Sequence, residues 1–164
     1  TPSARAEIEI IEAPTMDILY VTVDESRGNP GSPEFDIAAA LSAAFQEVAA
    51  FMTENGVPTD GKPMAINRTG GERGYELLAA IPYRPQPVSP SGRIKAGKSP
   101  SGPAVRIVHR GPYASMATSY EKMAAYMDVH ELKEGAASWE HYVSDPAEIS
   151  EDQLVTLIYF QISP

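Results

Sequence analysis

The sequence predicts an α+β protein made of two strand–helix–strand–strand units, which form an antiparallel sheet with two long helices and a central cleft. Three observations support this class. Each half of the chain holds one long segment with apolar residues at helical spacing. Short alternating or β-branched segments flank each of them, and their order is the same in both halves. We therefore expect one domain over residues 1–164, with repeat 1 at about 7–90 and repeat 2 at about 91–164.

In the first half, a long helix follows two strands. Ser32 precedes Pro33 and Glu34, which is typical of a helix start, and the helix runs to about Asn55 with Gly56 as its stop. Its apolar face consists of Ile37, Leu41, Phe45, Val48 and Met52. The other expected elements are strands at 7–12, 17–23, 63–67 and 75–83, turns at 26–33 and 69–71, and a proline-rich loop at 84–103.

The second half repeats this order. A helix is expected from about Ala114 to Leu132, with Gly135 as its end. Its buried face consists of Met116, Tyr120, Met123 and Met127. The other expected elements are strands at 104–110, 138–143 and 153–162, and turns at 111–112 and 145–146.

Composition excludes several classes of function. The formal net charge is −9 and there is no cysteine. A negative surface repels phosphate backbones, so we expect no direct nucleic-acid binding. No apolar run is long enough to span a bilayer, and no signal-peptide pattern is visible, so we expect a soluble, cytoplasmic protein. The chain begins at Thr1 rather than Met, which leaves a removed segment open.

Three short motifs carry little weight. Residues 92–99 match a phosphate-binding loop, but prolines on both sides remove the strand and the helix that such a loop needs. Asn67 heads a glycosylation match without a secretory context. The three histidines lack metal-ligand spacing, so we expect no metal and no cofactor.

The segment 138–143 is the most informative. In a strand, Glu140 and Tyr142 point to one face, whereas Trp139 and His141 point to the other. A carboxylate beside a tyrosine is often a solvated surface pair. On the floor of a groove it would instead favour a cationic ligand or have a raised pKa. The residues alone leave both interpretations open.

Several segments together resemble one family. They are Ala96-Gly97, Ala104 to Tyr113 with His109-Arg-Gly-Pro-Tyr113, Ser119-Tyr120, Glu140-His-Tyr142-Val-Ser-Asp145-Pro146, and Thr156-Leu-Ile-Tyr159. Their order and spacing over residues 96–162 resemble the GyrI-like small-molecule-binding family, the effector-binding domain of the AraC type that also occurs in multidrug-responsive MerR-type regulators. The likeness is vague over residues 1–95.

This resemblance implies a duplicated strand–helix–strand–strand fold with a cleft for bulky, often cationic aromatic compounds. It implies that Glu140 sits in the cleft with Tyr142 alongside, and Tyr113 carries over with a role that could be structural. Two departures stand out: Leu157 replaces a glutamate that the family often has, and Trp139 is bulkier than expected. We expect Tyr20, Tyr75, Trp139 and Tyr159 to line the cleft.

The favoured function is a stand-alone small-molecule-binding protein, since no segment reads as a helix-turn-helix. One alternative is a hydrolase that opens strained rings of DNA-alkylating natural products, in which Glu140 and Tyr142 would be catalytic. Others are an acidic protein-interaction module such as a gyrase inhibitor and, more remotely, a haem-binding protein that uses His109 or His141. The edge at residues 7–12 could form a homodimer.

Overall fold

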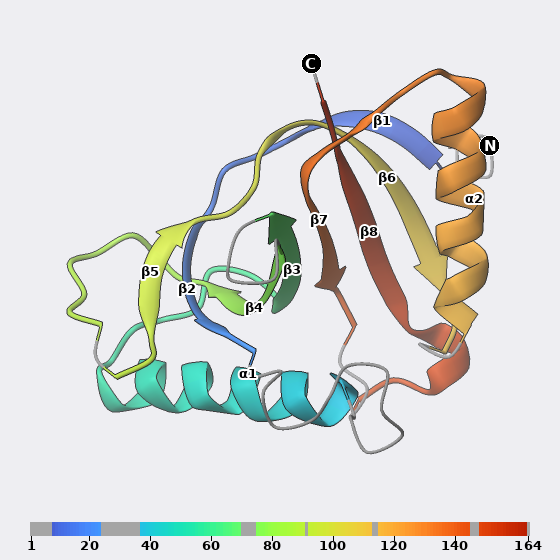
Figure 1. Cartoon of the computed structure of the whole chain (residues 1–164). Coiled ribbons are helices and arrows are strands. Elements are labelled where there is room, and N and C mark those ends of the chain that lie inside the picture. Colours follow the sequence, from blue (N-terminus) through green and yellow to red (C-terminus); the bar gives the residue numbers. More distant parts are fainter. Residues whose placement is uncertain are drawn as a thin grey trace. The chain divides into compact units, whose positions relative to one another are not determined.

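The computed structural model describes residues 8–23, 37–69, 75–90, 92–112, 115–144 and 148–163. The elements in chain order are β1 (Ile8–Ala13), β2 (Asp17–Thr22), α1 (Ile37–Glu54), β3 (Met64–Thr69), β4 (Tyr75–Pro82), β5 (Lys95–Lys98), β6 (Gly102–Arg110), α2 (Met116–Val129), β7 (Glu134–Tyr142), the 3₁₀ turn η4 (Glu151–Gln153) and β8 (Val155–Ile162) (Figure 1). The strand pairs described below are antiparallel, and the predicted α+β class is confirmed.

The chain divides into two compact units. The terminal unit comprises Thr1–Thr15 and Pro100–Pro164, and the central unit comprises Met16–Ser99. In the terminal unit the strand order is β1-β6-β8-β7, and α2 connects β6 to β7. In the central unit the order is β5-β2-β4-β3, and α1 connects β2 to β3. The two units thus share one topology, while an origin by duplication and a repeat boundary near residue 90 stay predictions.

Each edge strand pairs with a strand from the other half of the sequence. Strand β1 leads directly to β2 along the chain, yet it pairs with β6 over six residues, from Ile8 opposite Ile107 to Ala13 opposite Gly102. Strand β5 leads to β6, yet it pairs with β2 from Asp17 opposite Lys98 to Tyr20 opposite Lys95. The edge strand of the terminal unit, β1, thus comes directly before β2 of the central unit. The edge strand of the central unit, β5, comes directly before β6 of the terminal unit.

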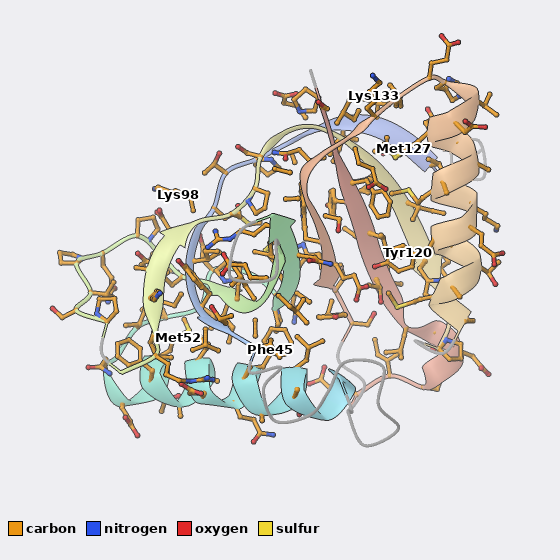
Figure 2. The ribbon with its side chains drawn as sticks, viewed as in Figure 1. Phe45, Met52, Lys98, Tyr120, Met127 and Lys133 are labelled. Carbon is orange, nitrogen blue, oxygen red and sulfur yellow. The ribbon has the colours of Figure 1, made fainter. Side chains whose placement is uncertain are left out.

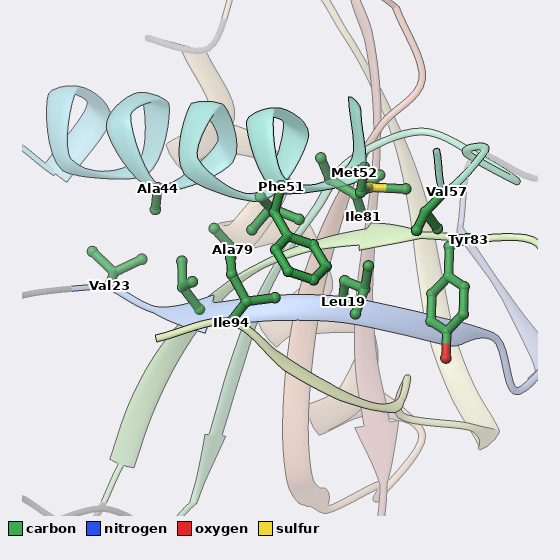
Figure 3. Close-up of a cluster of buried hydrophobic side chains, with 12 residues drawn as sticks. Leu19, Val23, Ala44, Phe51, Met52, Val57, Ala79, Ile81, Tyr83 and Ile94 are labelled. Carbon is green, nitrogen blue, oxygen red and sulfur yellow. The ribbon is translucent and has the colours of Figure 1, made fainter. Parts of the chain in front are cut away.

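The core of the central unit is apolar and lies between α1 and its sheet. The predicted helix face is confirmed for Val48 and Met52, which are buried, and for Leu41 and Phe45, which pack against the same cluster. Figure 3 shows α1 side chains meeting those of β2 and β4. The buried members are Leu19, Val21, Val23, Ala44, Val48, Phe51, Met52, Val57, Ala79, Ile81, Tyr83 and Ile94. Gly56, with φ 66°, ends the helix as predicted.

The core of the terminal unit lies between α2 and its sheet. Met116, Met123 and Met127 of the predicted face are buried, and Tyr120 packs against the cluster that they form with β6 and β8. The prediction that Gly135 ends this helix is wrong. The helix ends at Val129, because Glu131 takes the left-handed conformation with φ 55° and the N–H of Leu132 donates to the carbonyl of Met127 over 2.8 Å.

Gly135 belongs instead to strand β7, which starts at Glu134 rather than at the predicted residue 138. The β7–β8 register shifts between Glu134 and Ser138, as at a β-bulge. A Cβ on Gly135 would lie 3.0 Å from Oε1 of Gln161. That glutamine accepts the N–H of Ala136 and donates to the carbonyl of Ser101, so the glycine leaves room for a side-chain bridge.

A second correction concerns residues 84–103, which were expected to be a loop throughout. They contain β5, which pairs with β2. A Cβ on Gly97 would lie 3.1 Å from Cε1 of Tyr20, so glycine permits this close approach, and Ser99 exchanges hydrogen bonds with Met16. The match to a phosphate-binding loop at 92–99 therefore belongs to an edge strand. Lys98 pairs with Asp17 there and stands at no helix start.

The remaining expected strands are found with shifts of one or two residues. The final strand begins at Val155 rather than at 153, because η4 occupies the preceding residues. The turns expected at 26–33 and 145–146, Gly70 and Gly71 of the turn at 69–71, and the start of the first helix at Ser32 lie outside the described residues. None of the helices in the described ranges combines the length and the apolar character that a membrane span requires.

Candidate functional site

Strand β7 presents its even-numbered residues to the α2 side of the terminal sheet. Glu140 lies opposite Ile158 of β8, and Tyr142 lies opposite Thr156. Because Ile158 belongs to the core under α2, side chains opposite it lie on the same face. The strand alternation predicted from sequence therefore directs Glu140 and Tyr142 toward the helix.

Two tyrosines hold the carboxylate of Glu140. The hydroxyl of Tyr142 donates to Oε1 over 2.7 Å, and the hydroxyl of Tyr120, from α2, donates to Oε2. All three side chains are partly buried. Figure 2 shows Tyr120 on the side of α2 that faces the strands. We call Glu140, Tyr120 and Tyr142 the Glu140 cluster.

The protonation state of Tyr120 follows from this arrangement. Burial raises its pKa well above the ordinary tyrosine value, and the negative charge of Glu140 and the hydrogen bond to it raise the pKa further. The phenol therefore stays neutral and remains a hydrogen-bond donor. Two such donors stabilise a carboxylate that is partly removed from water.

An aromatic ring extends the cluster along β8. The ring centroid of Phe160 lies 5.8 Å from that of Tyr120, in a tilted arrangement. Phe160 lies opposite Ser138 of β7. Carboxylate, phenol and phenyl groups thus follow one another on the helix side of β7 and β8.

A second polar group ties the start of α2 to strand β6. His109 is buried; its Nε2–H donates to the carbonyl of Pro112 over 3.0 Å, and its Nδ1 accepts from the hydroxyl of Ser119 over 2.7 Å. The Ser115 hydroxyl lies 3.3 Å from Nε2. Since both ring nitrogens of His109 are engaged, this histidine is built into the fold rather than exposed as a haem ligand.

Trp139 and Tyr159 face the opposite side of the terminal sheet. Their rings stack with centroids 4.9 Å apart and planes 8° apart, and both residues are buried. Burial raises the pKa of Tyr159, which Arg106 partly offsets. Arg106 also pairs with Glu9 of β1. Leu157 lies on this same face of β8, so the departure from the family glutamate does not alter the side of the sheet that carries Glu140.

The other predicted aromatic residues are not brought into the Glu140 cluster by any described contact. Tyr20 belongs to the central unit, where the guanidinium of Arg68 lies 5.5 Å from its ring centroid. Arg68 in turn pairs with Glu76 over 2.6 Å. Tyr113 and the side chain of Tyr75 lie outside the described residues. Their roles stay predictions.

Sequence reasoning missed Tyr120 as a partner of Glu140. Its spacing to Met116 and Met123 predicted a core position, and its ring does pack against the core. The spacing gave no indication that its hydroxyl donates to Glu140. The signal that could have found it is the Ser119-Tyr120 pair within the family pattern. His109 and Ser119 carried the same kind of signal.

Each unit has one helix over an antiparallel sheet, and the terminal unit holds a carboxylate between two tyrosines; the protein is therefore of the α+β class. The chain belongs to the GyrI-like family, since the model of the GyrI-like small molecule binding domain matches residues 6–163. This confirms the family expected from the resemblance and extends the match over the first half of the chain. No curated protein matches the sequence.

Solved structures share the fold. A hydrolase encoded by lin2189 from Listeria innocua is 19% identical, with a TM-score of 0.64 and coverage of 95% of this chain and 91% of the other. The EcmrR C-terminal domain is 14% identical, with a TM-score of 0.73 and coverage of 95% and 96%. SAV2435, solved with tetraphenylphosphonium bound, is 11% identical, with a TM-score of 0.65 and coverage of 96% and 94%.

Proposed function

We propose that this small-molecule-binding protein takes bulky aromatic cations, with the Glu140 cluster as the anionic end of its site. The observation that carries the proposal is a partly buried carboxylate whose two oxygens accept hydrogen bonds from two tyrosine hydroxyls. None of the ion pairs found among the described residues involves Glu140. Its carboxylate oxygens thus accept from hydroxyl donors, and the ion pairs of the described residues leave its negative charge without a cationic partner.

Aromatic groups beside the carboxylate suit the same ligand. A cation over the face of a tyrosine or phenylalanine gains about 0.5–1 kcal/mol at exposed sites and about 2 when desolvated. Tyr120, Tyr142 and Phe160 supply such rings. Trp139, Tyr159, Tyr20, Tyr75 and Tyr113 remain proposed lining residues. Burial of aromatic surface supplies affinity, and the carboxylate supplies selectivity for positive charge.

The test is a calorimetric titration with tetraphenylphosphonium, with neutral triphenylphosphine oxide as its uncharged counterpart. The wild type should prefer the cation, and Glu140→Gln should weaken cation binding about 10-fold or more, since about 1.4 kcal/mol equals a tenfold change. Glu134→Gln is the matched control, because Glu134 lies exposed on the same strand. Equal affinities of the two variants for the cation would contradict the role of Glu140.

A second candidate function is hydrolysis of a strained ring. A carboxylate can deprotonate or orient a water molecule, and a neutral tyrosine can donate a hydrogen bond to the substrate. The Glu140 cluster contains both groups, and the similarity to a Listeria innocua hydrolase agrees with this candidate. Incubation with a cyclopropane-bearing DNA-alkylating compound should then give a product heavier by one water, and Glu140→Gln should abolish it. If the compound is recovered unchanged, hydrolysis is excluded and binding is the function that remains.

A further inference from the structure

Thr156 of β8 carries a hydroxyl that is out of place in a protein core. Its side chain is fully buried, and Oγ1 forms no hydrogen bond with any part of the chain that the structure describes. Buried polar groups are nearly always paired, because an unpaired one loses its hydration without compensation. Such an exception in a native fold needs an explanation, and a hydrogen-bonding ligand is one source of the missing partner.

The strand register places this hydroxyl beside the Glu140 cluster. Thr156 lies directly opposite Tyr142 on β7 and opposite His109 on β6. It shares the helix side of β8 with Ile158, which lies opposite Glu140. Thr156 and Glu140 are thus diagonal neighbours, a relation that separates side chains by about 7–8 Å between backbone positions and somewhat less between Cβ atoms.

The hydrogen-bond donors of the two neighbours in this row are already engaged elsewhere. Both ring nitrogens of His109 are engaged, with Ser119 and with Pro112. The Tyr142 hydroxyl donates its proton to Glu140. The Thr156 hydroxyl can rotate freely and can both donate and accept, so its lack of a partner reflects the arrangement of the row.

We propose that Thr156 is a hydrogen-bonding position for the ligand, and that the ligand class is an organic cation with a hydroxyl group close to its positive charge. Glu140 takes the charge, and Thr156 Oγ1 exchanges a hydrogen bond with the ligand hydroxyl one diagonal step away. This inference rests on the proposed function and narrows it from aromatic cations in general to hydroxylated ones. The unpaired hydroxyl is then a cost to the ligand-free fold that binding removes.

The experiment uses two cations that differ by one hydroxyl: ethyltriphenylphosphonium and (2-hydroxyethyl)triphenylphosphonium. Calorimetry gives the affinity ratio of the pair for the wild type, Thr156→Val and Thr156→Ser. We expect the ratio to favour the hydroxylated cation about 5- to 10-fold more in the wild type than in Thr156→Val, the size of one hydrogen bond. Thr156→Ser should retain the wild-type ratio.

A melting experiment without ligand checks the physical basis. Thr156→Val removes an unpaired buried hydroxyl, so its melting temperature should rise by about 2–4 °C. Ser99→Ala is the matched control, because Ser99 is also buried and its hydroxyl accepts the N–H of Met16 over 2.8 Å. That variant should melt at a lower temperature than the wild type.

The outcomes separate this inference from the proposed function. If both cations bind and their affinity ratio is the same in the wild type and in Thr156→Val, the inference alone is overturned. An ordered water would then be the hydrogen-bond partner of the Thr156 hydroxyl. A lower melting temperature of Thr156→Val also overturns it, because the hydroxyl then has a partner within the fold. Failure of the wild type to bind either cation overturns the proposed function and this inference with it.

Discussion

The central and terminal units have the same topology but differ beneath their helices. In the central unit, α1 covers a cluster made of apolar side chains and Tyr83. In the terminal unit, α2 covers an apolar cluster together with a buried histidine, a buried serine, a buried threonine and the Glu140 cluster. One architecture thus supports a dry core in one copy and a polar interior in the other.

The difference is clear strand by strand. The strand that precedes each helix presents Leu19, Val21 and Val23 in the central unit, but Val105, Ile107 and His109 in the terminal unit. Strands β3 and β7 differ less: β3 presents the buried Ala65 and the exposed Asn67, and β7 presents the partly buried Glu140 and Tyr142. Polar groups in a core cost stability, and this contrast is the reason that our proposal assigns the binding site to the terminal unit.

The largest effect on stability should come from the dry core. Leu19 is fully buried in it, so Leu19→Ala should lower the free energy of unfolding by about 2–5 kcal/mol. Urea denaturation measures this loss. The affinity of the folded variant for tetraphenylphosphonium should remain within about twofold of the wild type. If the affinity for tetraphenylphosphonium falls together with the stability, the assignment of stability to the central unit and of binding to the terminal unit is contradicted.

A smaller effect should come from the polar interior of the terminal unit. Ser119→Ala leaves Nδ1 of the buried His109 without its donor, which should cost about 1–3 kcal/mol in urea denaturation. Ser115→Ala is the control, since Ser115 is exposed and contacts the other ring nitrogen over 3.3 Å. Equal losses in the two variants would show that the buried bond is no stronger than the exposed one.

The smallest effect should appear at alkaline pH. The folded protein holds the Tyr120 proton more tightly than the unfolded chain, so the contribution is complete below the ordinary tyrosine pKa of about 10 and declines above it. The free energy of unfolding of the wild type should fall by up to about 1.4 kcal/mol per pH unit more than that of Tyr120→Phe. Parallel curves for the two proteins would mean that Tyr120 titrates normally in the fold.

Sequence reasoning reached the fold because periodicity and turn chemistry act locally. The face of the first helix, its end at Gly56 and the alternation around Glu140 all follow from spacing and from single residues with special backbone preferences. Strand β5 was not predicted, because its pairing depends on β2, which is distant in the sequence. Gly97 is needed for the close approach of the Tyr20 ring, and no local pattern shows that contact.

The candidate site was predicted in part. Glu140 and Tyr142 could be placed on one face because they lie on one strand. The Tyr120 contact joins α2 to β7 across 20 residues, and the His109–Ser119 bond joins α2 to β6, so both depend on how the helix packs. The unpaired Thr156 hydroxyl is a property of three strands in register, which single-sequence patterns do not encode.

The exchange of edge strands limits how this protein can be divided. Cutting the chain after residue 90 would leave β1 on a fragment without its partner β6. It would also leave β5 on a fragment without its partner β2. Each fragment would expose the backbone donors and acceptors of an unsatisfied strand, a surface prone to aggregation. Expression of either half alone should therefore yield insoluble material, whereas co-expression of both halves should restore the β1–β6 and β2–β5 pairs.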